Sequence, residues 1–472
     1  MKTFSVILFI WFVLLPLPSV SQENSSQSRN VEELRKQLQE LRSQMDKIQT
    51  ELDRLATGDR PSASSASEPA PVVSRGRVAG ETAAYQIFSE EPIAAPRLDN
   101  APIDPQYRQY FRLPGTSTLL KIGGFFKTDF IHDVRPAGNT FEFIPSTIPV
   151  PSPSGVFNSN VSVRPTRVNL DFLIPTTHFG PVRFYIESDF LGDDATTPHL
   201  RHAYAQADNL LIGQTFTNFM DPDAVPDTLD PEGPNGLVKL RNPQFRYTFA
   251  TGKNGSLSIS VEEPSSDIPS TTAEFKAQPN SPSPDGTIRF RQEFERGHVQ
   301  VAALFRSISG FFPSGTTNSV LGWGVSAAGA FRPFAKDTFV WQGTYGEGIS
   351  RYVQDTAPLG IDAQIAGGSR MHLRATPETA LEAAFQHYWL ERLRSSAVYG
   401  FVQVVNSSEQ QATTFHRSGY ASANLIWNPI GSLYLGPEFL YGWQVLKNGT
   451  SGNAPRIQFS AKYKFVKTAE KD

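Results

Sequence analysis

The chain of 472 residues contains no cysteine, so neither disulfide bonds nor thiolate metal sites contribute to its fold. After the first fifteen residues it also lacks any apolar run long enough to cross a bilayer as a helix. The formal charge is −3 and no segment is strongly basic, which argues against a nucleic-acid partner. If the mature chain lies in a membrane, strands must hold it there.

Polar and apolar residues alternate without a break over residues 456–465. In a β-strand, Ile457, Phe459 and Phe465 would share one face, and Arg456 and Lys462 would lie on the other. The pattern recurs along the chain, often with aromatic residues on the apolar side. Such repetition is typical of a membrane-spanning β-barrel, with lipid outside and water inside. The 35 glycines and 11% aromatic residues suit this fold better than a helical bundle.

We therefore predict an all-β fold, a transmembrane antiparallel β-barrel of about 16 strands over residues 118–466. The first strand begins near Leu119, and the others are expected at 168–174, 182–190, 200–206, 210–216, 244–249, 256–262, 287–294, 298–306, 323–331, 338–345, 369–375, 381–389, 420–427, 433–443 and 456–465. Short links, including 376–378, alternate with long ones, including 132–161, 218–242 and 390–419. Short turns mark the periplasmic rim, so both ends of the barrel should lie there.

Residues 1–21 are expected to be a secretory signal peptide, because Met1-Lys2 precedes an apolar run and Ser19-Val20-Ser21. The alternative is an uncleaved anchor helix. A Pro, Ala and Ser-rich stretch, residues 57–117, is predicted to be a linker. Residues 467–472 are expected to be a C-terminal tail.

Residues 22–56 are predicted to form an α-helical coiled coil in the periplasm, because apolar residues recur at alternating spacings of three and four. The seam consists of Val31, Leu34, Leu38, Leu41, Met45, Ile48, Leu52 and Leu55. The alternative is a helix that packs on its own barrel. The mixed seam residues do not determine how many helices associate.

Several long motifs resemble the DcaP-like porin family. They are LPGT from residue 113, KIGGFFK from 121, YIESDF from 185, RHAY from 201, LIGQTFTNFMDPDAVPDTLD from 211 and EGPNGL from 232. The similarity runs from about Leu113 to the end of the chain. It implies a trimeric porin of the Gram-negative outer membrane that passes small, often anionic solutes such as dicarboxylic acids. Such barrels commonly end on an aromatic residue, whereas seven residues follow Phe465 here.

The predicted loop 218–242 is long, rich in proline and glycine, and acidic. We expect it to fold into the lumen and narrow it; the alternative is an ordinary extracellular loop. Its candidate constriction residues are Asp221, Asp223, Asp227, Asp230 and Glu232.

Arginines on the predicted inward faces form a candidate ladder opposite this loop. A guanidinium stays charged and binds a carboxylate through two parallel hydrogen bonds, so the ladder would provide a path for carboxylates. The candidate pore-lining residues are Arg167, Arg183, Arg201, Arg246, Arg289, Arg291, Glu187 and Asp189. Alternatively, the arginines only pair with Asp171, Glu187, Asp189 and Glu293 and keep the lumen polar.

Two other function classes remain open from the sequence. An outer-membrane hydrolase would need a nucleophile beside a histidine, and no recognisable nucleophile motif is present. Glu187 and Asp189 share a face and could act as a carboxylate pair, although pore lining is the ordinary interpretation. His199 and His202, three apart on a strand, should point to opposite faces, so no metal or other cofactor is expected. A tether or adhesin, with the coiled coil as its working part, is the second alternative.

Overall fold

The computed structural model describes residues 110–176, 180–192, 197–268, 278–312, 315–334, 336–366 and 372–465. The predicted signal peptide, coiled coil and C-terminal tail lie outside these residues, as does most of the predicted linker. Within the described ranges, no helix is long and apolar enough to cross a membrane.

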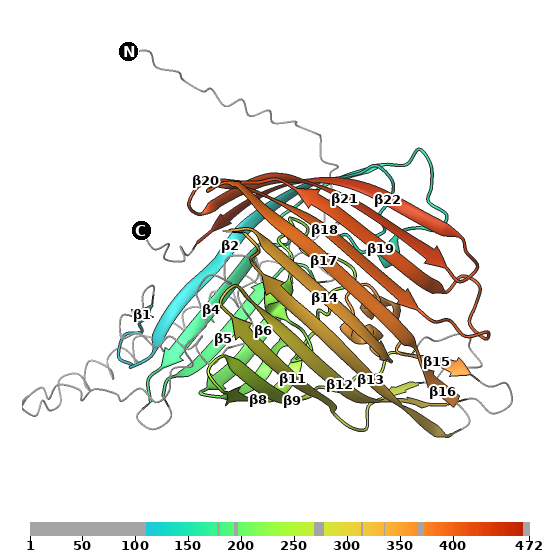
Figure 1. Ribbon diagram of the computed structural model, residues 1–472, viewed down its shortest axis with the longest axis horizontal. Helices are drawn as coiled ribbons and strands as arrows, with labels where there is room; N and C mark the ends of the chain where they lie inside the picture. Colours follow the sequence, from blue (N-terminus) through green and yellow to red (C-terminus); the bar gives the residue numbers. More distant parts are fainter. Residues whose placement is uncertain are drawn as a thin grey trace, which may run out of the picture. The chain divides into compact units, whose positions relative to one another are not determined.

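Twenty of the described strands join into one antiparallel sheet (Figure 1). They are β1 (Phe111–Arg112), β2 (Leu119–Asp133), β3 (Asn158–Ser162), β4 (Arg167–Ile174), β5 (Val182–Asp189), β6 (His199–Ala207), β7 (Leu210–Phe216), β8 (Arg241–Thr251), β9 (Gly255–Glu262), β10 (Gln278–Asn280), β11 (Asp285–Phe294), β12 (Gly297–Phe311), β13 (Thr317–Phe331), β14 (Thr338–Glu347), β17 (Pro377–Leu390), β18 (Leu393–Val404), β19 (Phe415–Asn424), β20 (Ile426–Ile430), β21 (Leu433–Leu446) and β22 (Ser451–Lys464). A separate hairpin consists of β15 (Ala363–Ala366) and β16 (His372–Ala375). Short 3-10 helices lie at Pro145–Thr147, Pro222–Ala224, Ser350–Tyr352 and Ala357–Leu359.

The sheet closes into a barrel because β2 pairs with β4 along one edge and with β22 along the other. The short strands β1 and β3 also pair with β2, β10 pairs with β12, and β20 continues the path of β19. The wall therefore has sixteen strands, which confirms the predicted all-β barrel.

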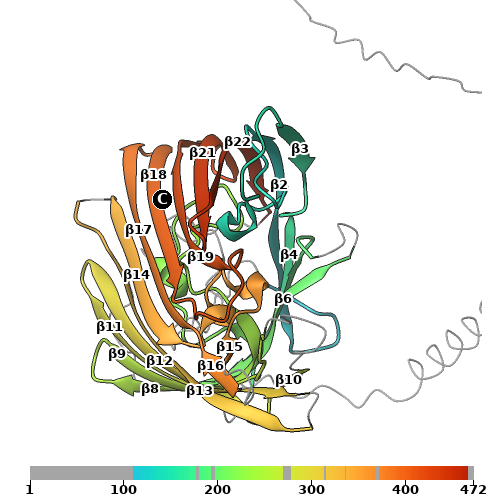
Figure 2. The same cartoon turned by 90° about the vertical axis from the view of Figure 1, so that its right-hand side faces the viewer.

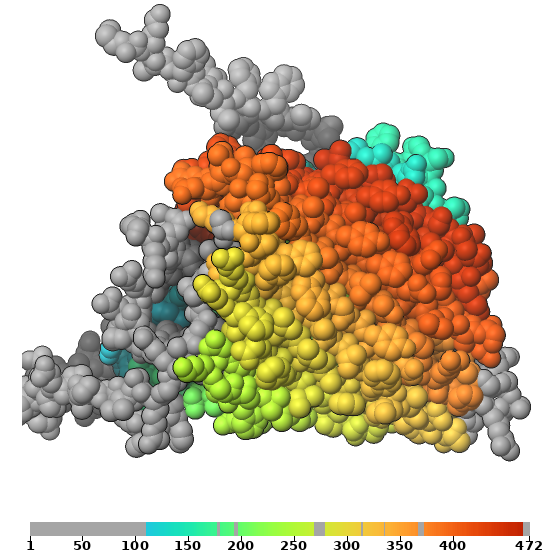
Figure 3. Space-filling model, viewed as in Figure 1, coloured from blue at the N-terminus to red at the C-terminus, as the bar shows by residue number. Residues whose placement is uncertain are grey.

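The two faces of the wall have opposite chemistry. On β22, Ile457 and Phe459 are half exposed on the outside, whereas Arg456 and Gln458 are fully buried inside. Figure 3 shows the outer surface over β11 to β22 as a continuous wall. Apolar residues facing lipid and polar residues facing the lumen are expected of a barrel in a bilayer, where every backbone group must be paired within the sheet.

Short turns such as Asp208-Asn209 lie at one rim, together with the start of β2 and the end of β22. Longer connections lie at the opposite rim, and three of them matter below. We call them L1 (134–157, between β2 and β3), L3 (217–240, between β7 and β8) and L6 (348–376, between β14 and β17). Figure 2 looks into this rim and shows loop segments inside the ring of strands.

Two predicted strand assignments need correction. The described part of the predicted strand 369–375, residues 372–375, is not in the wall, because β16 pairs only with β15; the link 376–378 is therefore not a turn of the short-turn rim. In contrast, β18 lies within the segment 390–419 that was predicted to be a loop. Its inner face carries Val398, Val402 and Val404, which pack against the folded-in loops, so polar and apolar residues do not alternate there. The two errors cancel in the strand count.

Candidate functional site

L3 folds into the lumen and follows its inner wall. Phe219 and Met220 are fully buried in a cluster with Leu304 of β12, Tyr352 of L6 and Val402 of β18. These contacts come from strands on widely separated parts of the barrel, so the loop crosses the interior.

The first polar anchor of L3 is at β11 and β12. Arg291 Nη1 lies 3.0 Å from Asp221 Oδ1, and Arg291 Nη2 lies 2.9 Å from Asp223 Oδ2. His298 Nε2 is 2.7 Å from Asp221 Oδ2. Asp221 also accepts the backbone N–H of Asp223 at 3.1 Å, which caps the short helix of the loop. Both acidic side chains are therefore held by the wall.

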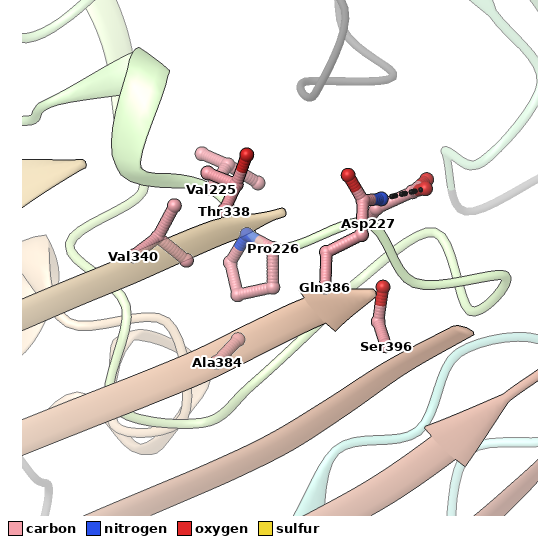
Figure 4. A pocket seen from close by; sticks show the side chains of 8 residues that line it. All are labelled: Val225, Pro226, Asp227, Thr338, Val340, Ala384, Gln386 and Ser396. Carbon is pink, nitrogen blue, oxygen red and sulfur yellow. Dashed lines mark hydrogen bonds between the residues drawn. The ribbon is translucent and has the colours of Figure 1, made fainter. Parts of the chain in front are cut away.

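The second anchor is at β17 and β18. Asp227 Oδ2 accepts hydrogen bonds from Arg394 Nε and from Gln386 Nε2, each at 2.6 Å. Figure 4 shows Asp227 with Gln386, and Val225 and Pro226 of L3 beside the inner faces of β14, β17 and β18. Only a small crevice is left between loop and wall.

The third anchor joins L3 to β21, β22 and L1. Glu438 Oε2 of β21 accepts the backbone N–H groups of Leu229 and Asp230, at 2.7 and 2.8 Å. Asp230 Oδ2 accepts the backbone N–H of Phe143 at 3.1 Å and lies 4.0 Å from Arg456 Nη1. Burial raises the pKa of Asp230, and the Arg456 charge opposes this shift.

On its way back, L3 presses directly on the wall. A Cβ atom at Gly236 would lie 2.1 Å from the carbonyl oxygen of Leu381 on β17, so only glycine fits there. Asn235 Nδ2 donates to Ser418 Oγ of β19 at 2.8 Å. The Ser418 hydroxyl in turn donates to Asp355 of L6.

Asp355 connects the three loops. Its Oδ1 accepts the backbone N–H of Ser146 in L1 at 2.9 Å, and its carbonyl oxygen accepts the Ser146 hydroxyl at 2.6 Å. Burial raises the pKa of Asp355 to about 6, and hydrogen bonds from Ser418 and Ser146 oppose the shift. Asp355 of L6 thus bonds L1 directly, and L3 reaches the same carboxylate through the Ser418 hydroxyl of β19.

The three ladder arginines on β4, β5 and β6 pair with carboxylates of the same strands. Arg183 donates to both oxygens of Asp171, at 2.8 and 2.9 Å. Arg201 donates to Glu187 at 3.1 Å and to Asp189 at 2.6 Å. Arg167 lies 3.5 Å from Glu187 and 3.8 Å from Asp189. The pairing weighed as the alternative is therefore present, and it holds the guanidinium groups in a fixed orientation.

The remaining candidate arginines are not equivalent to these three. Arg246 is buried and donates to the carbonyl oxygen of Phe216 at 2.5 Å and to Gln244 Oε1 at 2.9 Å. Arg289 donates to Ser258 Oγ at 3.0 Å. Arg291 belongs to the first L3 anchor, as described above. The side chain of Arg183 is 14% exposed, against 4–5% for those of Arg167 and Arg201, so Arg183 is the ladder arginine that solvent reaches most easily.

Comparison with known proteins identifies the barrel. The model of the DcaP outer membrane protein family matches residues 114–465. The chain belongs to this family. The outer membrane channel DcaP of Acinetobacter baumannii is 23% identical, with a TM-score of 0.67 over 75% of this chain and 99% of that one. None of the curated proteins matches.

Two further solved structures resemble the barrel more weakly. The anion-selective porin from Comamonas acidovorans is 9% identical, with a TM-score of 0.49 over 74% of this chain and all of that one. Outer-membrane expressed OmpT of Vibrio cholerae is 10% identical, with a TM-score of 0.48 over 75% of this chain and 99% of that one. Scores this low support no argument about this chain.

As a member of the DcaP family, the protein is an outer-membrane porin and not an enzyme. The predicted orientation of its histidine pair is wrong. A register shift between Glu187 and Ser188 leaves Arg201 as an extra residue in β6, so His199 faces Asp189 and His202 faces Glu187. His199 Nδ1 is 3.0 Å from Asp189 Oδ1. In the described part of the chain, no group of three or more His, Asp or Glu side chains is arranged to hold a metal ion.

Sequence reasoning missed several residues of this porin lumen. Arg394 was missed because its strand was taken for a loop. Glu438 lies on a strand that was predicted, but an alternating pattern does not reveal which loop a lumen residue binds. Two lysines of β22 each lie over an aromatic ring, and these partners were also missed. Lys462 Nζ lies 4.3 Å from the ring centre of Phe125, and Lys464 Nζ lies 4.8 Å from that of Tyr434. Their inward direction could be read from the alternation in β22, but their aromatic partners could not.

Proposed function

We propose that this porin is a passive diffusion channel for small hydrophilic anions, dicarboxylates among them, which pass between L3 and the ladder formed by Arg167, Arg183 and Arg201. The charge distribution across the lumen supports this proposal. The inner faces of β22, β2, β4, β5 and β6 carry eight basic and five acidic side chains; these are Lys121, Lys127, Arg167, Arg183, Arg201, Arg456, Lys462 and Lys464 against Asp129, Asp133, Asp171, Glu187 and Asp189. L3 carries five acidic side chains and one lysine.

A solute between these two sides experiences a transverse field, although the acidic loop is not a bare negative surface. Asp221, Asp223, Asp227 and Asp230 all approach cations of the wall. Their negative charge is largely compensated where they are anchored, so L3 acts chiefly as a rigid wall. Selectivity is then carried by the ladder and its neighbouring lysines.

The paired state of the arginines suits transport better than tight binding. A solute carboxylate that reaches Arg183 competes with Asp171 for the same N–H donors, because the fork of the guanidinium is already occupied. Binding is therefore weak and exchange is fast, and a channel needs both for solutes to leave.

Single-channel recordings in a planar bilayer test the proposal. Replacing Arg183 and Arg201 by serine should lower the anion-to-cation permeability ratio measured from reversal potentials in a KCl gradient. The control is Arg296→Ser, which removes an exposed arginine from a turn outside the lumen. If the double variant and the control have the same ratio as the wild type, the ladder does not set selectivity. A protein that folds but conducts no current would favour a tether.

We also infer a homotrimer whose coiled coil lies in the periplasm. The support is the regular seam from Val31 to Leu55 and the family membership of residues 114–465. We expect the coil to stabilise an assembly that the barrels already form. Native mass measurement on the protein without residues 31–55 should still give trimers, and a monomer would show that the coil drives assembly. Current steps in multiples of three would give independent support.

A further inference from the structure

The short strand β1 lies beside the start of β2, which β22 does not reach. β22 ends at Lys464, opposite Phe125 of β2, and the last rung is the bond from Phe465 N–H to the carbonyl oxygen of Gly124. Below this point β2 continues to Leu119, so six of its residues, 119–124, have no partner in β22. β1 pairs with the first two of these residues, with Phe111 opposite Leu120 and Arg112 opposite Leu119.

The hairpin that places β1 is well formed. Leu113 N–H donates to the Thr118 carbonyl oxygen at 2.9 Å, and Thr116 N–H donates to that of Leu113 at 3.2 Å. Gly115 has a φ of +73°, which favours glycine in such a turn. An open strand edge near the bilayer would leave backbone groups unpaired, which is costly.

The residue before β1 reaches into the lumen. Tyr110 Oη donates to Asp171 Oδ2 at 2.7 Å, and Lys121 Nζ lies 5.7 Å from the centre of its ring. The same Asp171 carboxylate holds Arg183 through two hydrogen bonds. Burial and the neighbouring Asp171 charge raise the pKa of the Tyr110 hydroxyl, so it remains a donor at neutral pH.

We propose that β1 is a strap that closes the wall below β22, and that Tyr110 is a specificity-determining residue at the short-turn end of the ladder. Its hydroxyl donates a hydrogen bond to the Asp171 carboxylate and partly compensates its negative charge. This lessens the repulsion between Asp171 and an anionic solute beside Arg183. Its ring narrows the passage at the same level. The inference rests on the proposed function in taking the ladder as the solute path.

The hydrogen bond from the Tyr110 hydroxyl to Asp171 is not needed for the pairing of β1 with β2. The rungs between β1 and β2 are formed by the backbone of Phe111 and Arg112, so any side chain at position 110 would leave them intact. Tyr110→Phe removes only the hydrogen bond to Asp171, whereas Tyr110→Ala also removes the ring. The two variants therefore separate the effect on charge from the effect on width.

The experiment uses the full chain in planar bilayers with KCl as the probe. Tyr110→Phe should lower the anion-to-cation permeability ratio by about twofold to fivefold, as expected for the loss of one partly solvated hydrogen bond to a charged group. Tyr110→Ala should lower the ratio and also raise the single-channel conductance. The controls are Tyr399→Phe and Tyr399→Ala, because Tyr399 lies on the outer face of β18 and is 53% exposed.

The outcomes separate this inference from the proposed function. If both Tyr110 variants match the Tyr399 variants in ratio and conductance, the role of Tyr110 is refuted, whatever the wild-type selectivity. If the wild type shows no anion preference but Tyr110→Ala still conducts more, the proposed function fails and the narrowing by Tyr110 stands. The resistance of the folded barrel to dodecyl sulfate at room temperature confirms that each variant has folded.

Discussion

The contact between Asp227 and Arg394 should determine how firmly L3 is held, and a double-mutant cycle can measure its contribution. The side chain of Asp227 is 2% exposed and that of Arg394 is 11% exposed. Removing one member of a buried ion pair costs about 3–5 kcal/mol, because the other charge is left without compensation. Arg394→Gln leaves the more deeply buried Asp227 with Gln386 alone, so we expect a loss of about 3 kcal/mol in the free energy of unfolding.

Asp227→Asn should cost less, about 2 kcal/mol, because the more exposed Arg394 can recover some hydration. The double variant leaves no uncompensated charge, so its loss should fall short of the sum of the single losses by about 2 kcal/mol. The measurement is reversible urea unfolding in lipid vesicles, followed by tryptophan fluorescence. In single-channel records, each single variant should also show more current noise, because the loop is less firmly anchored.

The exposed pair between Lys336 and Glu391 is the matched control. Its atoms are 4.0 Å apart and the side chains are 59% and 89% exposed, so its coupling should be below about 0.5 kcal/mol. If the losses at Asp227 and Arg394 add within the same limit, the ion pair does not hold L3, and the loop is fixed by its apolar and backbone contacts.

Two other contacts of the loops give simple tests. Gly236→Ala would place a Cβ 2.1 Å from the Leu381 carbonyl oxygen, so L3 must move into the lumen. The single-channel conductance should fall, and the free energy of unfolding should drop by about 1–3 kcal/mol. Unchanged conductance would show that L3 does not contact β17 closely there. Because the pKa of Asp355 rises from 3.8 to about 6, its contribution to stability is complete below pH 3.8 and is lost as pH rises through about 6. Amide exchange at 349–359, corrected for its intrinsic pH dependence, should therefore be faster at pH 7.5 than at pH 5. Asp355→Asn should abolish this difference. A difference that persists in the variant would show that another group causes the pH dependence.

The alternation of side chains was enough to predict the barrel, the inward direction of Arg167, Arg183 and Arg201, and the position of the acidic loop. This signal is local, because a strand with lipid on one side and water on the other must alternate. The partners were harder to predict, since Asp227 and Arg394 are 167 residues apart in the chain. Only the folded loop brings them together.

The failures have specific physical causes. One extra residue in β6 reverses the direction of the side chains beyond it, so the prediction for His199 and His202 could not hold. Tyr110 lies in the stretch predicted to be a linker, where no alternating pattern indicates a lumen contact. The hairpin that carries it became visible only from the pairing of β1 with β2.

The strand that was missed, β18, suggests how the inner surface of such a barrel can be interpreted from its sequence. Inner residues that face water are expected to be polar, as are Arg167 and Asp171 on β4 and Glu187 on β5. Inner residues covered by a loop can be small or apolar, as are Ala384 on β17, Val398 and Val402 on β18, and Ala328 on β13. A wall strand whose lumen side is small or apolar over several residues, as on β18, is therefore covered by a folded-in loop, whereas polar inner residues occur both under L3, as Arg291 does, and along the ladder.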